Sequence, residues 1–184
     1  HQIMNSINMV KPISKWSQSI LSSKSITEIV RKAFKLAETE KPGVCVIELP
    51  EDIAKEEIID EPIKPILTRR PAADNRAIEV AINLILKSKN PIILAGNGTI
   101  RKRASDRLRI LVDNLGIGVI NTFMGKGAIS DEDEHSLFTI GLGSGDYNNL
   151  AIDESDLVIA IGYDLVEYSP SAWNRKEKRK KQII

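Results

Sequence analysis

Three segments of the sequence have residue types that could form a binding surface, and two of them could bind an anion. In the first, Gly96 and Gly98 separate the apolar run PIILA from a predicted helix. Glycines at such a turn let backbone amides approach a negatively charged group. A dinucleotide-binding fingerprint would need a third glycine at position 101, where this chain has Arg101. The segment therefore indicates either an anion-binding edge or a plain tight turn.

The other two segments combine charge with flexible or aromatic residues. Gly125, Lys126 and Gly127 offer flexible backbone and one cation, but the run is too short for a phosphate-binding P-loop, and a surface loop fits it equally well. The third segment, GYDLVEYSPSAWN at 162–174, contains Asp164, two tyrosines and a tryptophan, although only 4% of the chain is aromatic. This concentration predicts a ligand or partner surface.

Other catalytic and binding chemistries find little support in the sequence. For nucleophilic catalysis the chain offers two histidines, His1 and His135, and one cysteine, Cys45, but it has no GxSxG motif and no visible triad, so we predict no catalytic residue in this chain. Adjacent acids in DEDEH at 131–135 are typical of a solvated loop, and we predict no metal site. The basic run at 175–181 lacks the interleaved aromatic residues of a nucleic-acid site.

The composition sets the scale and the environment of the protein. A chain of 184 residues is long enough for one domain and part of another. A net charge of +1 gives no field that would attract nucleic acid or a membrane surface. No apolar run approaches the roughly 20 residues that span a bilayer, so we expect a cytoplasmic protein. Because the chain begins at His1 and ends inside an apolar run, we expect it to be a piece of a longer polypeptide.

Apolar periodicity predicts helices that alternate with short apolar strands. We expect a helix over 25–40 that begins with a capping box of Ser25 and Glu28, and a buried strand over 44–49. Prolines among mixed charges predict a linker over 56–73. The remaining expected elements are helices from Asp74 or Asn75 to about 85, at 104–115 and at 148–155, and strands at 91–96, 117–123, 157–162 and 181–184.

This alternation predicts the fold class and the place of a binding site. Helices between continuous apolar strands indicate a parallel sheet covered on both faces. The predicted fold is therefore α/β, a doubly wound parallel sheet of Rossmann-like type, preceded by a helix and strand left from an upstream α/β domain. In such sheets ligands bind beyond the carboxyl ends of the strands. All three candidate segments follow predicted strands, so we expect them to meet at this edge.

Five motifs follow one another along the chain, namely MVKPISKW, VRKAFKLAETEKPGVCVIELPEDIA, NPIILAGNG, MGKGAI and SDLVIAIGYDLVEYSPSAWN. Their order resembles that in the thiamine diphosphate-dependent enzymes and, among them, the acetolactate synthases. The resemblance implies that residues 1–55 are the C-terminal part of the pyrimidine-binding domain and that 56–73 form a linker. It further implies that 74–184 are the central domain, truncated at its C-terminal end.

The same resemblance implies a function for the complete protein. It would condense two pyruvate molecules to 2-acetolactate with loss of carbon dioxide, use thiamine diphosphate and Mg, and form a homo-oligomer. The family's catalytic glutamate and its metal-binding motif would lie outside 1–184, so the chain alone would bind neither cofactor and would be inactive. The alternatives are another thiamine-dependent decarboxylase or carboligase acting on a small 2-keto acid, or a non-catalytic nucleotide-binding or assembly domain.

The resemblance also suggests binding residues. Gln2 matches a position at the family's substrate channel, next to Ile3 where the family has an acid. Because Leu165 and Val166 stand where flavin-containing members have a polar pair, FAD is possible but less expected. We expect the aromatic segment 163–173 to form a packed wall instead. The residues that would contact a flavin or nucleotide are Gly96, Gly98, Arg101, Gly125, Lys126, Gly127 and Asp164.

Overall fold

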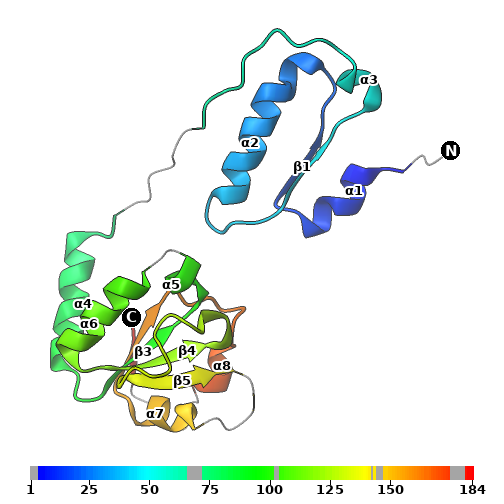
Figure 1. The fold of residues 1–184 in the computed structure, drawn as a ribbon. Helices are drawn as coiled ribbons and strands as arrows, with labels where there is room; N and C mark the ends of the chain where they lie inside the picture. Colours follow the sequence, from blue (N-terminus) through cyan, green and yellow to red (C-terminus); the bar gives the residue numbers. More distant parts are fainter. Residues whose placement is uncertain (1–3, 66–71, 102–103, 142, 144–146, 175–180) are drawn as a thin grey trace. The chain divides into compact units, whose positions relative to one another are not determined.

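The computed structural model describes residues 4–65, 72–101, 104–141, 143, 147–174 and 181–184. The chain divides into two compact units, 1–72 and 73–184, coloured from blue to cyan and from green to red in Figure 1. Residues 57–65 form no helix or strand. Within the described part of the chain, no helix is both long enough and apolar enough to cross a membrane.

The first unit is built on two parallel strands. Strand β1 (Trp16–Ser19) pairs with β2 (Cys45–Glu48), and helix α2 (Ile26–Glu38) contacts both strands and buries Ile29 and Ala33. The sequence predicted α2 and β2 but not β1. The other elements of this unit are α1 (Ser6–Val10), η1 (Lys11–Ile13), η2 (Ser23–Ser25) and α3 (Glu51–Ala54).

Two expected details of the first unit are wrong. The strand predicted over 44–49 is half-buried rather than buried, and Val44 and Leu49 are exposed, because a sheet of two strands covers each strand poorly. The capping box does not form either. Ser25 ends a 3-10 turn with helical backbone angles (φ −96°, ψ −4°), and its hydroxyl donates to the carbonyl of Ser22 at 2.8 Å. Since an N-cap residue needs a non-helical backbone, Ser25 cannot cap α2.

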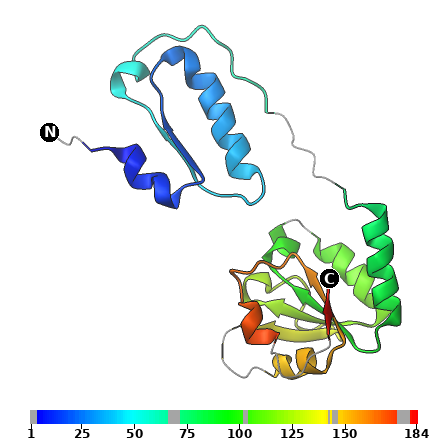
Figure 2. The ribbon, with the colours of Figure 1, turned by 180° about the vertical axis from the view of Figure 1, so that it is seen from behind.

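The second unit is a parallel sheet with helices on both faces (Figure 2). Its strands are β3 (Pro91–Ala95), β4 (Gly118–Thr122), β5 (Ser136–Ile140), β6 (Leu157–Ile161) and β7 (Gln182–Ile183). Its helices are α4 (Asn75–Lys87), α5 (Asn97–Arg101), α6 (Ser105–Leu115), α7 (Asn148–Glu154) and α8 (Pro170–Trp173), with the 3-10 turn η3 (Phe123–Gly125). The strand order is β5-β4-β3-β6-β7 and all pairs are parallel. The doubly wound α/β fold predicted from the sequence is therefore confirmed.

The strands of this sheet bury side chains on both faces. On β3, Ile93 and Ala95 join the core that α4 and α6 cover, whereas Ile92 and Leu94 join the core that α7 and α8 cover. Alternate residues of a strand point to opposite faces, so a strand covered on both sides must be apolar throughout. This explains why the sequence shows continuous apolar runs at β3, β4 and β6.

Strand β5 was missed, because the sequence assigned its residues to a loop. It is an edge strand, and its central residue Phe138 is exposed with a φ of 60°. Its pairing with β4 also shifts register between Val119 and Asn121. A short, irregular edge strand gives little periodic signal. The predicted fourth strand, at 181–184, is consequently the fifth strand of the sheet.

Asp156, which directly precedes β6, forms hydrogen bonds to the residues that follow α4. Its carboxylate accepts hydrogen bonds from the Ser88 hydroxyl, the Lys89 N–H (2.8 Å) and the Asn90 N–H (3.1 Å). These bonds, with the Ser88 hydroxyl as the largest cause, lower the pKa of Asp156 from its ordinary 3.8. The ionised carboxylate therefore stabilises the folded second unit.

We expect Asp156→Asn to lower the thermal unfolding midpoint at neutral pH. A folded-state pKa below the unfolded value stabilises the fold above the unfolded value, and this contribution disappears as the pH falls through the folded value. The difference between the wild type and the variant should therefore shrink as the pH falls below 3.8. Circular dichroism melting curves across this range measure it, and a difference that does not change with pH would contradict the assignment.

Candidate functional site

The carboxyl edge of the second sheet has one point where the strand order reverses. The chain runs outward from β3 through β4 to β5, and then returns to place β6 on the other side of β3. Doubly wound sheets bind their ligands in the crevice at this switch point. The loops after β3 and β6 flank it, so the sequence placed two of its three candidate segments at the relevant position.

These two loops are hydrogen-bonded directly to each other. The Gly96 N–H donates to the carbonyl of Ile161 at 2.9 Å, and the Gly98 N–H donates to the carbonyl of Gly162 at 2.8 Å. The Thr99 N–H donates to the Gly96 carbonyl at 3.0 Å, and the Thr99 hydroxyl to the Ile161 carbonyl at 2.9 Å. Protein backbone therefore occupies the position where this fold class binds a ligand.

Glycine is needed in these loops because the backbones touch. A Cβ on Gly98 would lie 2.7 Å from the Cα of Gly162, and a Cβ on Gly162, whose φ is +61°, would lie 2.3 Å from the nitrogen of Thr99. A Cβ on Gly125 would lie 2.3 Å from the carbonyl oxygen of Ala95. All three distances are far shorter than a van der Waals contact. The close approach that these glycines permit is thus between segments of the protein itself.

Glu167 lies at this edge and is buried, with 4% of the residue exposed. Both oxygens accept from the Asn97 N–H at 3.1 Å, and Oε2 also accepts from the Thr122 hydroxyl at 2.5 Å. Thr122 Oγ1 in turn accepts from the Gly125 N–H at 2.9 Å. Glu167 therefore joins the loops that follow β3, β4 and β6. Because Glu167 accepts from the Asn97 N–H, every backbone amide from 96 to 99 has a partner within the protein.

The aromatic residues after β6 form a packed wall, as expected. Trp173 is 2% exposed and lies in the core beneath α7. Its ring meets that of Tyr163 edge to face, with centroids 5.8 Å apart, and its Nε1–H donates to the Tyr163 hydroxyl at 3.2 Å. The same hydroxyl donates to the carbonyl of Tyr168. Burial is the main reason that the pKa of Tyr163 lies above its ordinary value of 10.0.

The cations Arg101 and Lys126 and the glycine Gly127, all predicted for this edge, lie in the segments that follow β3 and β4. Lys126 forms an exposed ion pair with Asp131, with Nζ and Oδ2 2.6 Å apart. Gly127 has a φ of +95°, which favours glycine at this turn of the loop. Arg101 is the last residue of α5. That these residues contact a cofactor stays a prediction.

The remaining predicted residues have separate positions. Asp164 Oδ1 accepts from the Val166 N–H at 3.4 Å in the turn after β6. Leu165 and Val166 are 68% and 81% exposed and give this turn an apolar surface. Gln2, the substrate-channel candidate, lies outside the described residues.

The residues that sequence reasoning missed as part of this edge are Glu167 and Thr122. A lone glutamate in the run VEYSP resembles an exposed residue, since isolated acids are rarely buried. Thr122 ends a β-strand in which threonine is common. Only the position of Thr122 at a strand end indicated that it could take part in the edge.

A small group of potential metal ligands lies elsewhere in the second unit. Asp113, Asp133 and His135 have ligand atoms within 4.8 Å of one another. The Asp133 carboxylate already accepts from the His135 backbone N–H at 2.9 Å and lies 3.2 Å from its ring Nδ1. The backbone bond is the largest cause that lowers the pKa of Asp133, and Arg109 adds to the effect. The Asp133 carboxylate is already bonded within the group, and the positive charge of Arg109 lies close to it. We therefore assign no metal to this group.

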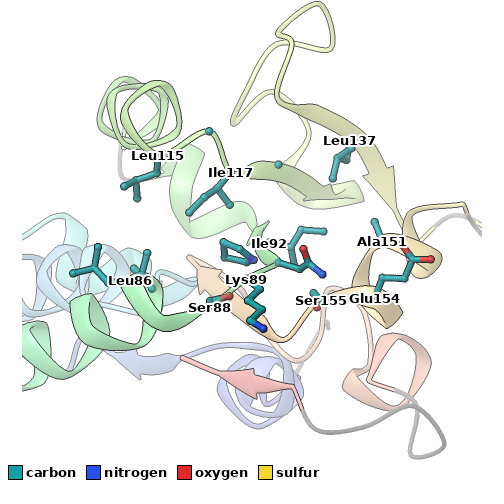
Figure 3. A pocket seen from close by; sticks show the side chains of 15 residues that line it. Leu86, Ser88, Lys89, Ile92, Leu115, Ile117, Leu137, Ala151, Glu154 and Ser155 are labelled. Atoms are coloured by element: carbon teal, nitrogen blue, oxygen red, sulfur yellow. The ribbon is translucent and has the colours of Figure 1, made fainter.

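The second unit also has a pocket of about 630 Å³ at the amino ends of β3 and β4. Figure 3 shows Leu86 and Lys89 on one side and Leu137, Ala151 and Glu154 on the other. This edge is opposite to the one at which doubly wound sheets bind ligands. The pocket is therefore not the candidate site.

The fold and the glycine loops at its switch point define the second unit as a Rossmann-like domain, the class that commonly binds nucleotides. Comparison with known families is more specific. Residues 78–184 match the family described as "Thiamine pyrophosphate enzyme, central domain". The chain belongs to this family, and the resemblance seen in the sequence is confirmed.

Several relatives match both units. The chain is 30% identical to the acetolactate synthase of Bacillus subtilis (strain 168), over 95% of this chain and 31% of the relative. It is 36% identical to a probable acetolactate synthase large subunit of Methanococcus aeolicus, over 88% of this chain and 28% of the relative. It is also 31% identical to the glyoxylate carboligase of Escherichia coli O157:H7, over 84% of this chain and 26% of the relative. The chain spans less than a third of the length of these relatives.

Proposed function

We propose that the complete protein containing this chain is a transferase or lyase that joins two pyruvate molecules to 2-acetolactate. Two pyruvate ions and one proton give one 2-acetolactate ion and one carbon dioxide. One carbon–carbon bond breaks in the donor pyruvate, and one forms to the carbonyl carbon of the acceptor. The observation that supports the proposal is the alignment with an acetolactate synthase over 95% of the chain, through both compact units.

A second candidate is a carboligase that acts on another small 2-keto acid. The similarity to a glyoxylate carboligase, at 31% identity, is as high as that to the Bacillus acetolactate synthase, at 30%. The higher identity to the Methanococcus relative, at 36%, favours pyruvate. The two candidates share the cleavage of a 2-keto acid and differ in the acid that is accepted.

Thiamine diphosphate, bound with Mg, would supply the electron sink that this cleavage needs. The switch point of the second unit does not fit the diphosphate of such a cofactor, because the amides at 96–99 are bonded within the protein. We therefore assign no chemical step to the described residues of this chain. In this proposal 74–184 serve as the central domain, 56–73 as a linker and 1–55 as the end of the pyrimidine-binding domain.

We also propose that the complete protein is a homo-oligomer of at least two chains, as its resemblance to the thiamine diphosphate-dependent enzymes implies.

The reaction is tested by following labelled pyruvate with NMR. With thiamine diphosphate and Mg, the complete protein should convert [2-13C]pyruvate into a product in which two labelled carbons are directly bonded, which gives a carbon–carbon coupling. Unlabelled glyoxylate in equal amount should leave most of this product unchanged. Acetaldehyde as the only product, or a product labelled at one carbon that forms only with glyoxylate, would contradict the proposal.

A further inference from the structure

The carboxylate of Glu167 lies where the loop after β3 meets the loop after β6. In the fold class of the second unit, the phosphates of a dinucleotide bind at this switch point, against the first amides of the helix that follows the first strand. The amide in that position here is the Asn97 N–H, and both oxygens of Glu167 accept from it at 3.1 Å. Glu167 thus brings a negative charge, from within the chain, to the position of the phosphate.

We infer that Glu167 is a built-in anion that fills the ligand position of this domain, so that the domain binds neither FAD nor another dinucleotide. The inference goes beyond the proposed reaction and does not depend on it. It reverses the expectation that the glycines of this edge hold a cofactor.

The hydrogen bonds already occupy each backbone amide from 96 to 99, where the first helix of this fold class would meet a phosphate. Gly96, Gly98 and Thr99 donate their amides to backbone carbonyls, and Asn97 donates to Glu167. The Gly125 N–H donates to Thr122 Oγ1 at 2.9 Å, in the same network. A diphosphate would have to break these buried bonds and also displace the carboxylate, which has the same sign of charge.

The steric fit leads to the same conclusion. A Cβ on Gly96 would lie 2.6 Å from the carbonyl oxygen of Gly162 and 2.8 Å from Oε2 of Glu167. The space directly beside Gly96 is therefore filled by the loop after β6 and by the Glu167 carboxylate. The turn beyond it presents Leu165 and Val166, whose side chains can neither donate nor accept hydrogen bonds. The residues at the switch point therefore do not fit a flavin.

Substitutions of Glu167 can show whether its carboxylate fills an anion-binding position or is only a buried side chain. Glu167→Gln keeps one oxygen that accepts from the Asn97 N–H but, in either orientation, places an NH2 donor beside the same N–H and removes the negative charge. Glu167→Ala removes a fragment with the size and charge of acetate. Glu132, an exposed glutamate in the loop before β5, provides the matched control as Glu132→Gln and Glu132→Ala.

The test combines ligand binding with thermal unfolding of the complete protein. We expect no saturable binding of FAD by the wild type in equilibrium dialysis up to about 1 mM. Glu167→Gln should melt about 5 °C or more below Glu132→Gln. Added acetate should raise the melting temperature of Glu167→Ala more than chloride does at equal ionic strength, and should not do so for the wild type or Glu132→Ala.

Three results would overturn the inference. They are stoichiometric FAD binding by the wild type, equal melting temperatures for Glu167→Gln and Glu132→Gln, and an acetate effect that is the same in all variants. If Glu167→Ala does not fold, the dialysis and the glutamine variants still decide the matter. None of these measurements uses catalytic activity, so a wrong assignment of the reaction would not affect them.

Discussion

Gly162→Ala is expected to lower the unfolding free energy of the second unit by about 2–5 kcal/mol. Gly162 has a φ of +61°, a conformation that costs other residues about 1–2 kcal/mol. The added Cβ would also lie 2.3 Å from the nitrogen of Thr99 and 2.6 Å from the carbonyl carbon of Gly98. Since both neighbours are backbone atoms, the two loops must move apart and their hydrogen bonds must lengthen.

Gly116 provides the matched control for this prediction. Its φ of +64° is nearly the same, but a Cβ there would meet nothing within 4 Å. Gly116→Ala should therefore cost only the conformational part, about 1–2 kcal/mol. In a Trp16→Phe background, Trp173 is the remaining tryptophan of the chain, and its fluorescence in denaturant reports on the second unit. Equal losses for the two alanine variants would show that the loops are not in close contact.

Trp173→Ala is expected to destabilise the second unit by about 3–5 kcal/mol. The indole is 2% exposed and packs against the core that includes Ile92, Leu94 and Ile152. Its removal leaves a cavity and also takes away the edge-to-face partner of Tyr163. The loop that holds Glu167 is attached to this wall, so the switch point should loosen as well.

Amide hydrogen exchange measures this effect without a tryptophan probe. We expect the amides of β3 and β6 in Trp173→Ala to exchange faster by a factor that corresponds to the lost stability. Trp173→Phe keeps an aromatic ring but loses the hydrogen bond to Tyr163, so it should show a clearly smaller change. Exchange in the alanine variant as slow as in the phenylalanine variant would mean that the indole does not support the core.

The sequence predicted those parts of the fold that have a strong local pattern. Strands β3, β4 and β6 are buried on both faces and appear as continuous apolar runs. Of the two predicted start positions of α4, Asp74 caps the helix by accepting from the Ala77 N–H. Strand β1, with the sequence WSQS, has a polar and half-exposed pattern, and it becomes a strand only because β2 lies beside it. Such pairing depends on tertiary contacts that a local pattern does not contain.

The position of the switch-point edge was predictable, but the contacts within it were not. Strand ends with glycine led to this edge of the sheet, because parallel strands bring their carboxyl ends together. The partner of Gly98 is Gly162, which lies far along the chain, so the sequence could not show that these glycines approach each other rather than a ligand. Nor could it show that Glu167 would be buried against Asn97 and Thr122.

The central claim is a thiamine-dependent formation of acetolactate that needs no flavin. Its most direct test is the rate of 2-acetolactate formation from pyruvate by the complete protein, freed of small molecules and supplied with thiamine diphosphate and Mg, with and without FAD. We predict that the rate depends on thiamine diphosphate and is the same in both preparations, because Glu167 and its bonded loops already fill the flavin position. Formation of 2-acetolactate only when FAD is added, or no formation under either condition, would contradict the account.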